Sequence, residues 1–269
     1  MISVLMATRN RLSQLRACLR SIARQTVAVP VQVCVVNDGG DSIVPVVEEF
    51  QREHPDVEIW FQDLPQNHGQ VFARNLALTA AKGEWIAFCD DDDRWLPTHL
   101  SSLLSVLQSH RADWVHADAE LVELRHESRG LTVVGRHPFA WRRAPELLRR
   151  YNPIIPSTVL YRKQVHVRLG RFDESVDHYW DWDFWLRLCT LSPPVRVPVA
   201  SVLYGIDQGG GNASADLDRM RERLRTLTAK HRLGELPAMN FLRMLERPDL
   251  APYRAPTRQL WDGDMALWQ

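Results

Sequence analysis

The 269-residue sequence has no excess of either charge, because its 33 basic residues are matched by 33 acidic ones. A chain without net charge has no long-range field that attracts nucleic acid, so we expect no nucleic-acid partner. Long apolar runs are also missing, since no window approaches the roughly 20 apolar residues that a membrane-spanning helix needs. The first residues lack a basic region followed by a long apolar core, so no signal peptide is predicted. We therefore expect a cytoplasmic protein without a transmembrane segment, with peripheral attachment to the inner membrane face as the alternative.

Closely spaced cysteines are absent as well. The four cysteines are Cys18, Cys34, Cys89 and Cys189, and no two have the C-x-x-C spacing of zinc sites and redox pairs. Each lies among apolar neighbours, so buried free thiols in a reducing compartment are expected. With 45% hydrophobic and 25% charged residues, the composition is that of a folded globular protein.

Short apolar runs alternate with amphipathic segments over the first half of the chain. The runs predict strands at 2–6, 31–36, 57–61 and 85–89, and the segment 70–82, closed by Gly83, predicts a helix. This alternation predicts an α/β fold, with a mainly parallel sheet flanked by helices. Later segments predict strands at 114–122 and 158–162, helices at 181–191 and 215–231, and a break at 193–198. Four prolines in the last 33 residues predict a loosely packed extension.

Polar clusters follow three of the predicted strands directly. They lie at 8–11, 37–40 and 90–93. Ligands of open α/β sheets bind beyond the carboxyl ends of the strands, so these clusters should meet in one crevice.

Four consecutive aspartates occupy positions 90–93, at the end of a predicted buried strand. Like charges this close repel each other unless a cation offsets them or a pKa rises. Carboxylate oxygens suit Mg²⁺ or Mn²⁺, which often share their coordination with substrate phosphates. The alternative is that Asp93 caps a helix beginning near Leu96 and that the other three are solvated.

A second acidic cluster lies among aromatic residues at 179–187, where Asp181 and Asp183 alternate with three tryptophans. Apolar walls and a helix start can tune the pKa of Asp181 for a general base, while indole faces can stack on a ring-shaped substrate. The alternative is that Asp181 only caps the helix. Asp183 is predicted to be structural, because residues two apart on a helix point in different directions.

Nine short motifs resemble, in order, those of family 2 glycosyltransferases. In the first half they read M-A-T-R-N-R at 6–11, V-V-N-D-G-G at 35–40, A-R-N at 73–75, A-K-G-E-W-I-A-F at 81–88, and the aspartates at 90–93, of which the first three match the family's D-x-D signature. In the second half they read N-P at 152–153, S-T-V-L at 157–160, G-R-F-D-E at 170–174, and W-D-W-D-F-W-L-R at 180–187, which is similar to the family's E-D-x-D-L-W-L-R helix. The resemblance covers residues 1–207.

This resemblance implies a GT-A fold and an enzyme that transfers a sugar from a nucleoside-diphosphate sugar with inversion at the anomeric carbon. The domain would span residues 1–207, with a nucleotide-binding half over 1–112 and an acceptor-side half over 113–207. A C-terminal helical extension would follow over 208–269. The donor would be a UDP-sugar by preference, the cofactor Mn²⁺ or Mg²⁺, and the acceptor a glycan, a lipid-linked sugar or a small-molecule natural product.

The resemblance also implies a role for each matching residue. The nucleotide would lie along Ala7, Thr8 and Arg9, Asp38 would contact the base or ribose, and Arg74 would lie near the nucleotide or diphosphate. In the acidic run, Asp90 would face the ribose or the metal shell, Asp91 would belong to the donor site, and Asp92 would hold the metal. Asp181 would be the catalytic base.

Three positions depart from the family pattern. Arg9 replaces an aromatic residue, Gly40 replaces a serine, and Trp180 stands where the family has glutamate. The acid role in this motif therefore falls to Asp181 alone.

Two other functions use similar features. A sugar nucleotidyltransferase would carry a glycine-rich phosphate loop after the first strand, but residues 7–12 contain no glycine. A non-catalytic sugar or nucleotide binding module would need the cation site but not Asp181.

Two C-terminal features each leave two interpretations open. Glycines at 209–211 could form a hinge for a lid over the donor, or only a linker. The arginine-rich segment 215–231 could be a solvated amphipathic helix or a surface for an acidic or membrane-linked acceptor.

Overall fold

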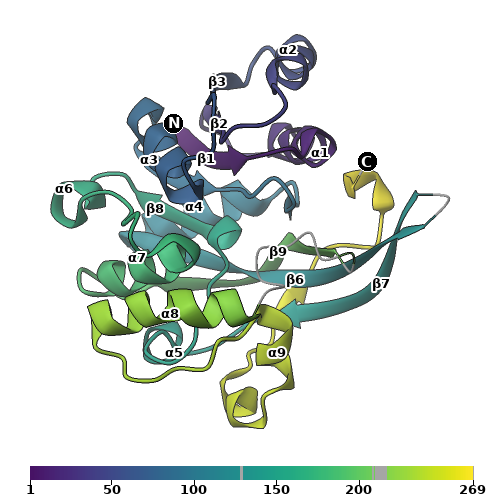
Figure 1. The fold of residues 1–269 in the computed structure, drawn as a ribbon. Helices are drawn as coiled ribbons and strands as arrows, with labels where there is room; N and C mark the ends of the chain where they lie inside the picture. Colours follow the sequence, from purple (N-terminus) through teal and green to yellow (C-terminus); the bar gives the residue numbers. More distant parts are fainter. Residues whose placement is uncertain (128–129, 208, 210–216, 269) are drawn as a thin grey trace.

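The computed structural model describes residues 1–127, 130–207, 209 and 217–268 (Figure 1). One ten-stranded sheet runs through it in the order β10-β9-β6-β8-β4-β1-β2-β3, with β5 paired to β9 and β7 paired to β6. The strands are β1 (Ile2–Thr8), β2 (Val31–Asn37), β3 (Glu58–Asp63), β4 (Trp85–Phe88), β5 (Arg94–Trp95), β6 (Trp114–Glu127), β7 (Gly130–Phe139), β8 (Val159–Arg162), β9 (Val195–Asp207) and β10 (Arg258–Gln259).

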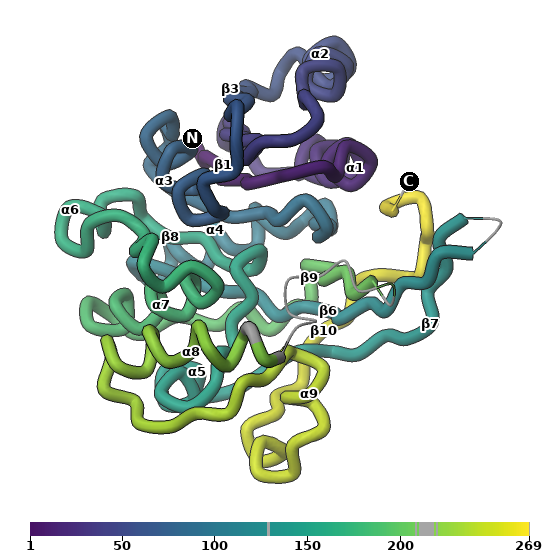
Figure 2. Tube along the Cα trace, viewed as in Figure 1, coloured from purple at the N-terminus to yellow at the C-terminus, as the bar shows by residue number. Residues whose placement is uncertain are grey.

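Helices cover both faces of the sheet, as Figures 1 and 2 show. They are α1 (Leu12–Ala23), α2 (Val44–Glu53), α3 (Gln70–Ala80), α4 (His99–Ser109), α5 (Ala144–Leu147), α6 (Val165–Leu169), α7 (Trp180–Cys189), α8 (Leu217–His231) and α9 (Phe241–Glu246). Successive residues of β1 point to opposite faces of the sheet, which places them in two different core clusters. Val4 belongs to a core cluster with residues of α1, α2 and α4, whereas Leu5 belongs to a cluster with residues of α3, α7 and α8.

The predicted α/β class and mainly parallel sheet are confirmed. β1 pairs in parallel with both β2 and β4, and β2 pairs in parallel with β3. These strands are apolar on both faces because helices cover both faces. β8 is inserted antiparallel between β4 and β6, which then pairs in parallel with β9.

Gly83 has a different role from the predicted helix stop. Helix α3 already ends at Ala80, three residues before it. A methyl group at Gly83 would lie 2.6 Å from the backbone nitrogen of Ser3, so glycine is required for the close approach to β1.

The second half of the chain contains strands that the sequence pattern did not predict. β7 forms a long antiparallel hairpin with β6. β9 begins inside the predicted break at 193–198, and Pro198 lies where the pairing with β6 shifts register. A proline is tolerated at such an irregularity because the ladder is already interrupted there.

The C-terminal residues pack more closely than predicted. β10 extends the sheet beside β9, and Trp261 and Trp268 are buried at 5% and 8% exposure. Three of the four cysteines are buried and all four are free thiols, as expected, whereas Cys189 is half-buried. In the part of the chain that the structure describes, no helix has the length and apolar character needed to cross a bilayer.

Candidate functional site

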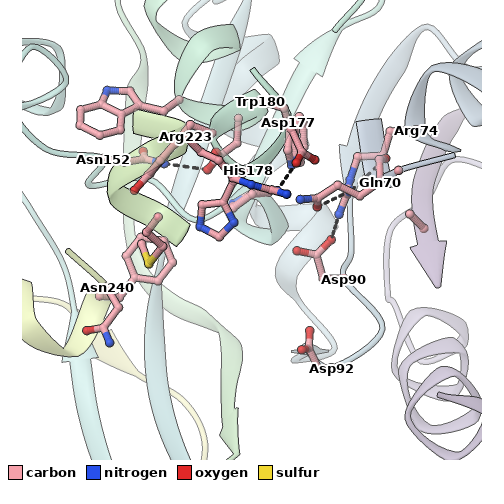
Figure 3. Close-up of a pocket in the computed structure, with 18 of the residues that line it drawn as sticks. Gln70, Arg74, Asp90, Asp92, Asn152, Asp177, His178, Trp180, Arg223 and Asn240 are labelled. Atoms are coloured by element: carbon pink, nitrogen blue, oxygen red, sulfur yellow. Dashed lines mark hydrogen bonds and ion pairs between the residues drawn. The ribbon is translucent and has the colours of Figure 1, made fainter. Parts of the chain in front are cut away.

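A cavity of about 560 Å³ opens at the carboxyl ends of the central strands. All three polar clusters contribute to its wall, which confirms that they converge. The sequence-predicted residues that line it are Ala7, Thr8, Arg9, Asp38, Arg74, Asp90, Asp91, Asp92 and Asp181. Figure 3 shows Asp90 and Asp92 on one side of this cavity, with Arg223 and Asn240 on the other.

Two of the four aspartates are anchored inside the protein. Asp91 accepts hydrogen bonds from the Thr8 hydroxyl at 2.6 Å and from Arg11 Nη1 at 3.0 Å. Asp93 is fully buried and accepts a hydrogen bond from the Ser157 hydroxyl. Burial, with the charges of Asp92 and Asp90, raises the pKa of Asp93 well above its usual range, which disfavours the charged form of this carboxyl.

The alternative interpretation of the acidic run is therefore wrong. Helix α4 begins at His99, its N-cap residue is Thr98, and Asp93 bonds to Ser157 instead. Asp91 is only 3% exposed and is not solvated.

The other two aspartates reach the cavity, with side chains that are 27% (Asp90) and 28% (Asp92) exposed. Asp90 forms an ion pair with Arg74, and Asp92 lies 2.8 Å from Arg11 Nη1. Burial of the loop and the charges of Asp91 and Asp90 raise the pKa of Asp92, although Arg11 lowers it. Two arginines, Arg11 and Arg74, thus face the carboxyls of Asp90, Asp91 and Asp92, while burial opposes the charged forms of Asp91 and Asp92.

This donor set fits a divalent cation that is only partly coordinated by protein. The described residues contain no cluster of three or more metal-ligating side chains. A cation at Asp90 and Asp92 would complete its coordination with water or with ligand oxygens, as Mg²⁺ commonly does with substrate phosphates.

Asp38 organises the loop that precedes α3. Its carboxylate accepts hydrogen bonds from the backbone amides of His68 at 2.7 Å and Gly69 at 2.9 Å, and from Asn67 Nδ2 at 2.6 Å. Gly69 has φ +99°, a conformation that favours glycine. Asp38 is 4% exposed, so it shapes the cavity wall through this loop as well as by its own surface.

Arg74 connects three elements around the cavity. Its guanidinium pairs with Asp90, donates to the side-chain oxygen of Gln70 at 3.0 Å, and lies with Cζ 4.5 Å from the ring centroid of Trp180. Trp180 therefore offers the face of its indole to a cation in this structure.

Asp181 lies on the cavity wall in the first turn of α7 and is 7% exposed. It accepts a hydrogen bond from Asn152 Nδ2 at 2.6 Å. Burial raises its pKa to about 7, against the opposing effects of the Trp182 backbone amide and Asn152. The N-cap residue of α7 is Tyr179, but the Trp182 backbone amide donates to the Asp181 carboxylate, so Asp181 also caps a free amide of the first turn, as the alternative interpretation expects.

Two further residues of this motif are structural. Asp183 is fully buried and pairs with Arg187 of the same helix and with Lys230 and His231 of α8, which joins α7 to α8. The indole of Trp185 is stacked on Trp114 and is fully buried, so of the three tryptophans Trp180 and Trp182, which line the cavity, are the ones that could stack on a substrate.

The far wall of the cavity comes from the C-terminal part of the chain, where the sequence carries no recognised motif. Its apolar residues are Tyr204, Met220, Pro237, Met239, Phe241 and Met244. Arg223 also lines this wall and pairs with Asp177. The sequence motifs include Asn152 and Arg11 without assigning a role to either, and no motif marks the side chains of this wall, because nothing in their spacing distinguishes them from ordinary loop and core residues.

Helix α8 is amphipathic, as one of the two interpretations predicted. Met220, Leu224 and Leu227 are buried, while Arg221 and Arg225 are exposed. The proposed hinge at 209–211 lies, apart from Gly209, outside the described residues.

Comparison with known proteins gives consistent matches. The sequence model of glycosyl transferase family 2 matches residues 3–168. The uncharacterized glycosyltransferase YwdF of Bacillus subtilis (strain 168) is 39% identical over 264 residues, which cover 98% of this chain and 96% of that protein. The amylovoran biosynthesis glycosyltransferase AmsE of Erwinia amylovora is 27% identical over 199 residues, which cover 72% of each protein.

Two solved structures share the fold. TarS residues 1–349 from S. aureus, in complex with UDP, has a TM-score of 0.61 at 19% identity, covering 84% of this chain and 65% of that one. The mannosyltransferase PcManGT from Pyrobaculum calidifontis, in complex with GDP-Man and Mn²⁺, has a TM-score of 0.59 at 18% identity, covering 88% and 65%. This chain therefore spans about two thirds of the length of either solved chain.

The raised pKa of Asp181 predicts that this residue lowers the free energy of unfolding at neutral pH. Well below pH 3.8, the usual pKa of the group, both folded and unfolded states hold the proton; between about pH 4 and 7 the unfolded state releases it while the folded state keeps it, so the free energy of unfolding falls as pH rises. The substitution Asp181→Asn should therefore raise the Tm relative to wild type more at pH 7.5 than at pH 4.5.

Thermal unfolding of both proteins at the two pH values measures this difference. Asp41→Asn, which changes an exposed carboxyl outside the cavity, is the control. A constant offset between Asp181→Asn and wild type across the pH range would show that Asp181 has an ordinary pKa.

Proposed function

The chain belongs to glycosyl transferase family 2 and is a glycosyltransferase with a GT-A fold, and we propose that it transfers a sugar from a nucleoside-diphosphate sugar with inversion, using Asp181 as general base. The observation that carries the proposal is a buried carboxyl with a pKa of about 7 on the wall of the cavity that also holds Asp90 and Asp92. Membership of this family removes the nucleotidyltransferase and the non-catalytic binding module as alternatives.

We assign the donor to the polar side of the cavity. Ala7, Thr8 and Arg9 would follow the nucleotide, Asp38 would meet the base or ribose, and Arg74 would meet the diphosphate. Support comes from their position at the carboxyl ends of parallel strands and from related folds, since TarS has been solved with UDP and with UDP-GlcNAc. A UDP-sugar is the preferred donor.

A divalent cation, Mn²⁺ or Mg²⁺, would be held chiefly by Asp92, with Asp90 assisting and Asp91 fixing the loop. The partly exposed carboxyls of Asp90 and Asp92 at the cavity and the Mn²⁺ in the PcManGT complex support this assignment. When bound, the cation neutralises charge on the departing diphosphate. Arg74 supplies a second positive charge beside Asp90.

Asp181 would act in a single displacement. An acceptor hydroxyl gives its proton to the Asp181 carboxylate as its oxygen bonds to the anomeric carbon. The bond from that carbon to the diphosphate oxygen breaks, and the electron pair leaves with the nucleoside diphosphate. Asn152 holds the carboxylate in place by its 2.6 Å hydrogen bond. Trp180 supports Arg74 from the position where related sequences carry glutamate.

The apolar wall is the proposed acceptor site, because it lies across the cavity from the donor residues and shares it with Asp181. Tyr204 and Phe241 meet edge to face with ring centroids 5.2 Å apart, close to Met239 and Met244 in the same wall. Rings and thioethers favour an acceptor with an apolar or ring-shaped portion. Among a glycan, a lipid-linked sugar and a small-molecule natural product, the last two fit this wall best.

Removing the Asp92 carboxylate should weaken donor binding. Asp92→Asn is expected to reduce Mn²⁺-dependent UDP binding about tenfold or more, since losing a charged partner commonly costs about 1.5 to 3 kcal/mol. Isothermal titration calorimetry with and without Mn²⁺ measures the change, and Asp41→Asn is the matched control. Equal affinities for wild type and Asp92→Asn would show that the cation does not bind at this loop.

Asp181→Asn should bind UDP and Mn²⁺ as wild type does, while kcat for transfer falls by roughly 10² to 10⁴. In the wild type, kcat/KM should fall about tenfold per pH unit below about pH 7, because protonated Asp181 accepts no proton. Until an acceptor is found, metal-dependent release of UDP from a UDP-sugar is the assay. Undiminished transfer and hydrolysis in Asp181→Asn would exclude Asp181 as the base.

Shortening the apolar wall should affect the acceptor alone. Phe241→Ala removes a ring whose burial is worth about 1.5 to 3 kcal/mol, so acceptor KM should rise roughly tenfold or more while UDP affinity stays constant. Phe61→Ala, a half-buried position on β3 outside the cavity, controls for lost packing. A matching loss of UDP affinity in Phe241→Ala would show that this wall belongs to the donor site instead.

A further inference from the structure

The last residues of the chain lie against the acidic run, although they line no part of the cavity. The C-terminal turn η5 (Met265–Trp268) contacts α1 on the side of the molecule where the chain ends (Figures 1 and 2). Its connection to the acidic run passes through Arg94, which directly follows Asp93. Arg94 is 2% exposed and donates from Nε to the main-chain oxygen of Leu267 at 2.9 Å.

The same guanidinium holds the backbone of the acidic run. Nη1 of Arg94 donates to the main-chain oxygens of Asp91 at 3.0 Å and Asp93 at 2.7 Å. The ring centroid of Trp268 lies 5.1 Å from Arg94 Cζ. One planar group therefore joins the carbonyls on either side of Asp92 to the C-terminal turn.

A second feature brings Trp268 near the backbone of Asp92, at Gly205 of strand β9. A methyl group at Gly205 would lie 2.6 Å from the main-chain oxygen of Asp92 and 3.0 Å from the Trp268 ring. The Asp92 carbonyl and the indole thus both pack against a residue without a side chain. Trp268 is 8% exposed and packs in a cluster with Leu96 and Leu203, which keeps its ring in place.

We propose that Trp268 is a positioning residue for the Asp92 carboxylate, an inference that rests on the proposed role of Asp92 in cation and diphosphate binding. Arg94 and Trp268 fix the main chain from Asp91 to Asp93, so Asp92 is presented to the cavity in one arrangement before any ligand arrives. Groups one layer behind a metal ligand tune affinity by limiting the movement of that ligand. The C-terminal turn thereby acts on the donor site without touching the donor.

Trp268→Ala tests this role, with Trp261→Ala as a matched control. Trp261 belongs to the same apolar cluster and is 5% exposed, but its ring lies 4.5 Å from Arg136 Cζ instead of against the acidic run. Trp268→Ala should weaken binding of Mn²⁺, measured by electron paramagnetic resonance, and of UDP with Mn²⁺, measured by calorimetry, about tenfold. Hydrogen exchange at the amides of residues 91–93 should also accelerate. Trp261→Ala should leave all three unchanged.

Two further variants keep the test decisive. Trp268→Phe retains a ring over Arg94 and should restore most of the affinity, while Gly205→Ala should reproduce the loss by displacing the Asp92 backbone. The inference would be overturned if folded Trp268→Ala kept the hydrogen-exchange rates at 91–93 and the Mn²⁺ affinity of the wild type. It would also be overturned if Trp261→Ala lost as much Mn²⁺ affinity as Trp268→Ala. If the wild-type protein binds no Mn²⁺, the proposed function of Asp92 fails instead, and faster exchange at 91–93 in Trp268→Ala alone would still show that Trp268 positions the loop.

Discussion

The organisation of this molecule depends on confining four consecutive carboxyl groups at the end of a buried strand. Each is compensated in a different way: Asp90 by Arg74, Asp91 by Thr8 and Arg11, Asp92 by Arg11, and Asp93 by a raised pKa and the Ser157 hydroxyl. The compensating groups come from the first loop, α3 and the turn before β8. Bringing them to one place requires β1, β4 and β8 to be neighbours, as they are in the sheet. The order of strands in the sheet therefore determines which groups can compensate the four aspartates.

The two acids of helix α7 show how position alone separates function from structure. Asp183 faces α8, where Lys230 and His231 pair with it and hold the two helices together, and Arg187 of its own helix pairs with it as well. Asp181 faces the cavity, where it has one side-chain donor, Asn152, and a pKa that burial raises to about 7. A group in the first environment is locked in its charged form, whereas a group in the second can gain and lose a proton near neutral pH.

The sequence predicted that the polar clusters meet at one cavity, because the signals there are local. Apolar runs that end at 8–11, 37–40 and 90–93 mark strand ends, and parallel strand ends meet at one edge of a sheet. The long hairpin of β6 and β7, the register shift at Pro198 and the burial of Trp268 depend on pairings between distant segments. The individual side chains of the apolar wall could not be predicted either, because Tyr204, Met239 and Phe241 are spaced like ordinary core residues.

These two sides of the cavity also differ in what holds them together. The side of the cavity that holds Asp90, Asp91 and Asp92 is connected by ion pairs with Arg11 and Arg74, so a change at one of these residues alters the electrostatic environment of the others. The far wall consists of apolar side chains contributed by β9, α8, α9 and the segment between the two helices, and α8 is fastened to α7 and η2 (Asp177–Tyr179) by ion pairs behind and beside that wall. Apolar contacts tolerate exchange of side chains when volume is kept. The side chains of this wall can therefore change while the ion pairs keep α7, and with it Asp181, in place at the cavity.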